Sequence, residues 1–129
     1  MKIVGAIARY LLGAAFLIFG LQNFFNFLHA PLPPGQAGEF LGLLVSTHFA
    51  YAVGAVMGIS GLLFLFNRFV ALGLVLLGPV LFNILLFHIV MQPKTIVPGV
   101  FATLLWFLVF WQHRAAFAGI FSAKLKEQA

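Results

Sequence analysis

The residues of this chain best suited to chemistry are uncharged polar side chains that lie in or beside long apolar runs. They are amides and imidazoles at six positions: Gln22, Asn23, Asn26, His48, Asn83 and His88. Amides donate and accept hydrogen bonds, and an imidazole can also exchange a proton near neutral pH. These side chains predict a ligand-binding pocket for a small amphipathic molecule, and a quinone headgroup is the kind of ligand we expect.

Spacing decides which of these side chains can act together. Gln22 and Asn26 are four residues apart, and Asn23 is three residues before Asn26, so each pair shares one face of a helix. Asn83 and His88 are five residues apart, which separates them by about 140° around a helix, and they need not point into one site. A second interpretation stays open, in which these groups bond to one another and close the end of a helical bundle without a ligand.

Several other kinds of chemistry are excluded. The chain contains no cysteine, which rules out thiolate catalysis, disulfide exchange and iron–sulfur ligation. It has no serine–histidine–acid set, phosphate-binding glycine loop or dinucleotide glycine pattern. Four candidate metal ligands are expected at one end of the molecule, but they lack zinc-ligand spacing: His29, His48, Glu39 and His88. We therefore assign no catalytic residue and no metal site, and we expect no independent catalytic activity.

Four apolar runs must position the polar residues: 3–28, 49–66, 69–91 and 96–112. Each is close to the ~17 to 25 residues that a helix needs to cross a bilayer. Hydrophobic residues make up 64% of the chain and charged residues only 7%, whereas charged residues are about a quarter of a soluble domain. The sequence therefore predicts one all-α integral membrane domain over residues 1–129. A signal peptide is the alternative for the first run, but no A-x-A-like cleavage site follows it.

The connections between the runs predict how the helices are arranged. The turn Asn67-Arg68 and the segment 92–95 allow only antiparallel neighbours, so we expect an up-down-up-down bundle of four transmembrane helices. In the first connection, a proline-rich stretch is followed by apolar residues at helical spacing. We expect a short amphipathic helix over 37–47 there, either as a packed lid over the bundle end or as a functional lid over a pocket. Pro79 is expected to kink its helix.

The few charged residues predict the orientation. Four spans place both termini and the 67–68 turn on one side, which then holds six of the seven basic residues: Lys2, Arg9, Arg68, Arg114, Lys124 and Lys126. The other side holds Lys94. Basic residues favour the cytoplasmic side, so we expect a multi-pass protein of the bacterial cytoplasmic (inner) membrane with both termini in the cytoplasm. Arg9 lies inside the first run, and we expect it to extend toward the lipid headgroups beside Tyr10.

Partners are predicted by the same residues. The lipid bilayer is the main one, and no nucleic acid is expected because the cations flank apolar spans and form no continuous basic face. Gly54, Gly58 and Gly61 have a spacing that lets a neighbouring helix approach closely. That neighbour is either another helix of the same bundle or, in a homo-oligomer, a helix of a second copy.

Two stretches carry a family resemblance. They are the segment from Gly61 to Ile89, with NRFV and PVLFNILLFH, and the first run, ARYLLGAAFLIFGLQNFFNFL. Both resemble the DoxX-like family of small four-helix bacterial membrane proteins, and the resemblance covers nearly the whole chain. It implies a four-helix membrane fold. Many relatives carry lysine at the position of Asn23 and an acidic residue about where Met57 stands, whereas this chain has neither charge.

The resemblance also bears on function. Some relatives resemble or accompany subunits of thiosulfate:quinone oxidoreductase, membrane redox complexes or receptor-assembly chaperones. We therefore expect an accessory or ligand-binding membrane protein of quinone or membrane redox metabolism, with a membrane redox protein or another membrane protein as partner. The alternative is a structural or assembly partner, similar to a membrane chaperone, with no small-molecule site.

Overall fold

The secondary structure is entirely helical over the residues that the computed structural model describes, 2–124 and 127. The helices, in order, are α1 (Lys2–Phe25), α2 (Gly35–Ser46), α3 (Phe49–Leu65), α4 (Val70–Met91), the 3₁₀ helix η1 (Pro93–Thr95), α5 (Val97–Gln112) and the 3₁₀ helix η2 (Arg114–Phe121). Lys126, one of the basic residues used to predict the orientation, lies outside the described residues. The all-helical prediction is confirmed for the described part of the chain.

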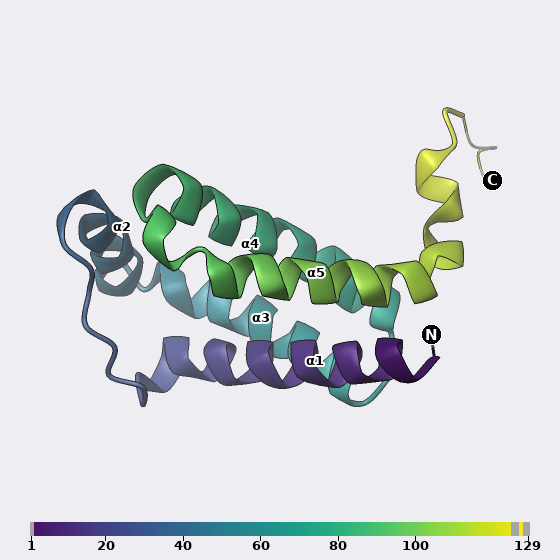
Figure 1. Cartoon of the computed structure of the whole chain (residues 1–129), viewed down its shortest axis with the longest axis horizontal. Helices are drawn as coiled ribbons and strands as arrows, with labels where there is room; N and C mark the ends of the chain where they lie inside the picture. The colour runs from purple at the N-terminus through teal and green to yellow at the C-terminus, as the bar shows by residue number, and fades with distance from the viewer. Residues whose placement is uncertain (1, 125–126, 128–129) are drawn as a thin grey trace.

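Four long helices pack side by side as a bundle (Figure 1). They are α1, α3, α4 and α5, and they run alternately in opposite directions (Figure 1). α3 and α5 each contact both α1 and α4, so α1 and α4 lie on a diagonal of the bundle. α2 lies at one end, and the start of α1 and the end of α5 lie together at the other (Figure 1). The short connections predicted this up-and-down order.

The first helix is shorter than the apolar run 3–28 that predicted it. α1 ends at Phe25, because Asn26 has a left-handed backbone with a φ of 48° and its N–H bonds to the carbonyl of Gln22 at 2.9 Å. Asparagine tolerates this conformation and commonly ends helices in this way. The chain then has no regular structure up to Pro34, after which α2 begins two residues earlier than predicted.

The core of the bundle is made of large apolar side chains that are almost fully buried: Leu12, Phe16, Phe64, Leu74, Leu77 and Val109. α1 and α3 pack most closely of all the helix pairs, and glycines allow this approach. A Cβ atom on Gly61 would lie 2.7 Å from the carbonyl oxygen of Gly13, and one on Gly54 would lie 2.8 Å from that of Gly20. Gly54 and Gly61 therefore serve packing within the bundle, whereas a Cβ on Gly58 would meet no atom within 4 Å.

Large apolar side chains also cover much of the outer surface of the bundle. Phe82 of α4 is 66% exposed and Leu104 of α5 is 58% exposed, and α1 exposes isoleucines along its length. α1 and α4 are long and apolar enough to cross a membrane. The number of candidate spans rises to four if each bent pair is one span, that is α2 with α3, bent by 85°, and α5 with η2, bent by 86°.

Candidate functional site

Gln22 and Asn26, two of the predicted ligand-binding residues, bond to each other at the end of α1. Nε2 of Gln22 donates to Oδ1 of Asn26 at 2.8 Å, and Oε1 of Gln22 accepts the N–H of Leu28 at 2.7 Å. Because the backbone N–H of Asn26 also bonds to the carbonyl of Gln22, the two amides close the helix end. The spacing predicted their contact, and the structure adds the role in ending the helix.

Asn23 reaches across to α3. Its Nδ2 lies 3.8 Å from the sulfur of Met57, which is buried, and this is a weak hydrogen bond because a thioether is a poor acceptor. The side chain of Asn23 packs over Gly54, where an added Cβ would lie 2.7 Å from the Cβ of Asn23. Positions 23 and 57, at which the DoxX-like resemblance implies a charged pair, are therefore in contact between α1 and α3.

His48 forms the corner between α2 and α3. Its backbone is left-handed, with a φ of 61°, and the two helices meet there at 85°. The imidazole stacks on Tyr51 with 5.2 Å between ring centroids, and Tyr51 stacks in turn on Phe24 of α1, also at 5.2 Å. This aromatic stack ties the corner to the end of α1. His48 is exposed, and among the described residues no hydrogen bond joins its side chain to the other five predicted site residues.

Asn83 and His88 bond to their own helix. Nδ2 of Asn83 donates to the carbonyl of Pro79 at 2.8 Å, and Nδ1 of His88 lies 2.7 Å from the carbonyl of Ile84. Asn83 is exposed because it is two residues from Leu81, which faces the core. The ring of His88 packs edge-on against Phe87, at 5.1 Å.

The six candidate residues therefore form separate local arrangements. Among the described residues, no hydrogen bond joins the polar side chains of α1 to those of α4. The bundle geometry gives the reason, since α1 and α4 lie on a diagonal and Asn83 faces outward. None of the six lines either of two cavities that the structure contains.

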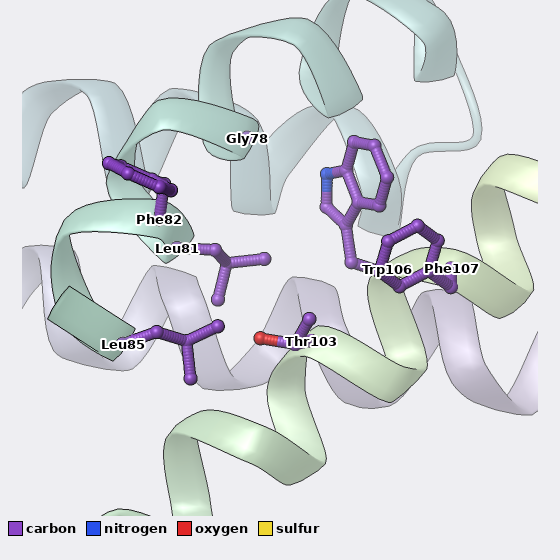
Figure 2. A pocket seen from close by; sticks show the side chains of 7 residues that line it. All are labelled: Gly78, Leu81, Phe82, Leu85, Thr103, Trp106 and Phe107. Carbon is purple, nitrogen blue, oxygen red and sulfur yellow. The ribbon is translucent and has the colours of Figure 1, made fainter. Parts of the chain in front are cut away.

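One of these cavities is an apolar groove of about 280 Å³ between α4 and α5. We call it the α4–α5 groove, and it is lined by Gly78, Leu81, Phe82, Leu85, Thr103, Trp106 and Phe107. Leu81 and Leu85 extend from α4 toward Thr103 and Trp106 of α5 (Figure 2). Its polar groups are engaged elsewhere, since the hydroxyl of Thr103 donates to the carbonyl of Gly99 at 2.8 Å.

Trp106 fixes the spacing of the two helices that form the groove. Its indole N–H donates to the carbonyl of Leu74 on α4 at 3.1 Å. α4 continues through Pro79. Because proline has no N–H, the carbonyl of Val75, four residues earlier, receives no helical hydrogen bond from it. Opposite the indole stands Gly78, where a Cβ would lie 3.7 Å from the Trp106 ring. A small residue facing a large one leaves the space that forms the groove.

Sequence reasoning missed the α4–α5 groove. Its lining residues are mostly apolar, and their pattern is that of any buried or lipid-facing helix. A signal was present in the adjacent glycine and proline at 78 and 79 in the middle of the helix, but it does not identify Trp106 as the facing side chain. The groove depends on the pairing of α4 with α5, which only the fold supplies.

Arg9, which the sequence predicts to extend toward lipid headgroups beside Tyr10, is held within the bundle near its end. Only 8% of it is exposed, and its guanidinium donates to the carbonyl of Phe64 near the end of α3. The charge also lies over the Tyr10 ring, 4.3 Å from the centroid. The last carbonyls of a helix carry about half a unit of negative charge, so the end of α3 compensates part of the buried cation.

Comparisons of the chain with protein-family models, with curated proteins and with solved structures gave no match. The DoxX-like resemblance therefore stays a hypothesis that rests on the residues quoted for it.

Proposed function

We propose that the chain is an integral membrane protein that holds the apolar tail of a membrane-soluble molecule in the α4–α5 groove. The observation that carries this proposal is that an apolar groove opens on a surface that is itself apolar. Phe82 and Phe107 line the groove and are 66% and 56% exposed. A molecule dissolved in the bilayer would reach the groove sideways, without passing through water.

The membrane location is supported by where charge and apolar surface lie. Large apolar side chains cover the outward faces of α1, α4 and α5, a pattern that lipid favours and water opposes. Lys2, Arg68, Lys94 and Arg114 lie near the ends of the long helices. The excess of cations at the end with both termini supports a cytoplasmic position for that end.

The size of the groove limits what it holds. Small-molecule pockets typically measure ~300 to 1,000 Å³, so a groove of about 280 Å³ holds part of an apolar tail rather than a whole molecule. Acyl chains of phospholipids and isoprenoid tails of quinones share this chemistry. The DoxX-like resemblance favours the quinone and an accessory role in membrane redox metabolism.

A structural or assembly role without a ligand is the second candidate function. It is favoured by one observation, that five of the six predicted site residues already make hydrogen bonds within the chain: Gln22, Asn23, Asn26, Asn83 and His88. Such residues can stabilise a bundle without contacting any ligand.

The experiment that tests the proposal has two stages. Alkaline carbonate washing of membranes should leave the protein in the pellet, and detergent should release it. The protein is then purified in an uncharged detergent, and its organic extract is analysed by mass spectrometry and ultraviolet absorption. We expect a bound quinone or phospholipid in a fixed ratio to protein.

A variant that fills the groove provides the decisive comparison. Gly78→Leu should reduce the bound molecule roughly tenfold, since it takes the place of a few methylene groups worth ~0.8 kcal/mol each. Gly58→Leu is the matched control, because no atom lies within 4 Å of a Cβ at that position. An extract without ligand, or equal occupancy in both variants, would contradict the proposal and favour the structural role.

The polar candidates are tested in the same extracts. If Asn83→Ala or His88→Ala loses quinone but keeps phospholipid, these side chains hold a headgroup while the groove holds the tail. If neither substitution changes the extract, the two side chains bind no ligand, and their role is limited to the hydrogen bonds with the carbonyls of Pro79 and Ile84.

A further inference from the structure

A second cavity, of about 370 Å³, lies at the end of the bundle opposite α2. We call it the terminal cavity, and it is lined by Lys2, Ala6, Arg9, Asn67, Gln112 and His113. These residues come from the start of α1, the turn between α3 and α4, and the end of α5. The cavity is therefore completed only by the folded bundle.

The terminal cavity is positively charged. Lys2 and Arg9 both line it from α1, and none of its described lining residues is acidic. The chain has only two acidic residues, Glu39 and Glu127. Glu39 belongs to α2, at the other end of the bundle (Figure 1), and Glu127 follows the end of η2. The cations in this cavity consequently lack an acidic partner on the cavity wall.

The spacing along α1 directs both cations to one face. Lys2, Ala6 and Arg9 are separated by four and three residues, which places them on the same side of a helix. Ala6 is small and leaves the space between the two charges open. Asn67, from the turn between α3 and α4, adds an amide to the lining of the cavity. A guanidinium, an ammonium and an amide around one space are donors of the kind that bind an oxyanion in proteins.

Arg9 has donors beyond those that its contact with α3 uses. A guanidinium carries five N–H groups in a planar fork that matches the oxygens of a phosphate. NH1 of Arg9 donates to the carbonyl of Phe64, and this bond anchors the group at the cavity wall. A buried cation held in place by a neutral carbonyl attracts an anion more strongly than an exposed one, because water screens it less.

We propose that the terminal cavity binds a phosphate-bearing anion, with Arg9 and Lys2 as the residues that hold it. The source is either the headgroup of an anionic phospholipid or free phosphate. The headgroup is favoured by the surroundings of the cavity, where Trp111 is exposed and Arg114 lies over its ring at 4.3 Å. Tryptophan with a neighbouring cation is typical of the membrane interface. Only this choice of source rests on the proposed membrane location; the anion site itself does not.

Two measurements on the full-length chain in an uncharged detergent separate the sources. Isothermal titration calorimetry with inorganic phosphate, with chloride as the reference anion, tests for free phosphate. Native mass spectrometry with equimolar phosphatidylglycerol and phosphatidylcholine tests for the lipid. For a headgroup site we expect wild-type protein to retain phosphatidylglycerol about tenfold more than phosphatidylcholine, as a charge-assisted hydrogen bond implies.

Three variants decide the outcome. Arg9→Gln and Lys2→Gln should each abolish most of the preference for phosphatidylglycerol. If Arg9→Gln prevents folding, Lys2→Gln still provides the test, because Lys2 is exposed at the first described turn of α1. Arg68→Gln removes the same unit of charge from the same end of the bundle but does not line the cavity, and it should keep the preference. Phosphate binding without lipid preference would assign the site to free phosphate.

Two results would overturn the proposal. One is that wild-type protein shows neither phosphate binding nor lipid preference. The other is that Arg68→Gln loses as much preference as Lys2→Gln, which would mean that net charge at this end, rather than the cavity, attracts the anion. A protein that binds phosphate but is released from membranes by carbonate would refute the membrane location while leaving the anion site in place.

Discussion

Asn23 and Met57 occupy a contact that could hold a charged pair but holds an amide and a thioether. Met57 is buried at 7% exposure, and its sulfur is 3.8 Å from Nδ2 of Asn23. A carboxylate introduced there would be buried beside a neutral amide. A buried charge is tolerated only when an opposite charge or several hydrogen bonds accompany it.

The first prediction concerns this contact. We expect Met57→Glu to destabilise the protein by about 3–5 kcal/mol, the usual effect of an uncompensated buried charge, and Asn23→Lys with Met57→Glu to recover most of that loss. Thermal unfolding in detergent measures both, and Asn23→Lys alone completes the double-mutant cycle. A double variant as unstable as Met57→Glu would mean that the two positions do not face each other as described.

Single residues also show what the sequence could and could not predict. The spacing of Gln22 and Asn26 correctly placed their side chains together, because residues four apart meet on any helix. Spacing could not identify the partner of Arg9. It gives the face of the helix on which a side chain lies, but not the acceptor on another helix, here the carbonyl of Phe64, which is 55 residues away in the chain.

Among the helix pairs of the bundle, α1 and α3 pack most closely. Gly61 of α3 lies against the backbone of α1, where an added Cβ would be 2.6 Å from the nitrogen of Leu17 and 2.7 Å from the oxygen of Gly13. Backbone atoms of a packed helix cannot move aside as a flexible side chain can. The approach of the two helices therefore depends on the missing side chain.

The second prediction follows from this packing. Gly61→Ala should lower the stability by about 1–3 kcal/mol, as overpacking usually does, and lower the melting temperature in detergent. Gly58→Ala, on the same helix but with open space around its Cβ, should leave the melting temperature unchanged or raise it slightly. Equal shifts in the two variants would show that helix propensity, not contact with α1, governs these positions.

Helices were easier to predict than their ends and corners. Apolar runs fixed the four long helices closely, since α3 covers 49–65 where 49–66 was predicted and α5 covers 97–112 where 96–112 was predicted. η2 was not predicted at all. It turns by 86° from α5 and packs through Phe117 on Phe110, with 5.0 Å between ring centroids. The polar residues Gln112, His113 and Arg114 mark the end of the apolar run, but they do not show that the chain continues as a second helix at a new angle.

The molecule as a whole has two unlike ends. The end with α2 carries amides and imidazoles that mostly bond within their own helix or helix end, and the end with both termini carries the cationic terminal cavity. Sequence reasoning placed the functional residues at the first end, because polar residues in apolar runs are conspicuous there. It could not see the second, since that cavity joins residues from three separate parts of the chain.

The third prediction concerns orientation. If the excess of cations marks the cytoplasmic end, a fluorescent protein fused to the C-terminus should fluoresce, and alkaline phosphatase fused at the same point should be inactive. Fusion within the loop between α1 and α2 should give the opposite pair of results. An active C-terminal phosphatase would contradict this orientation and place the terminal cavity on the outer side of the membrane.

The bond between Arg9 and the carbonyl of Phe64 joins residues 55 positions apart, and this separation affects how the chain is made. During synthesis, α1 leaves the ribosome well before its acceptor exists. Until then its guanidinium must take other acceptors, because burying a charge without a partner is costly. The cation can be buried only once the end of α3 is present, so α1 reaches its final packing no earlier than the end of α3 is made.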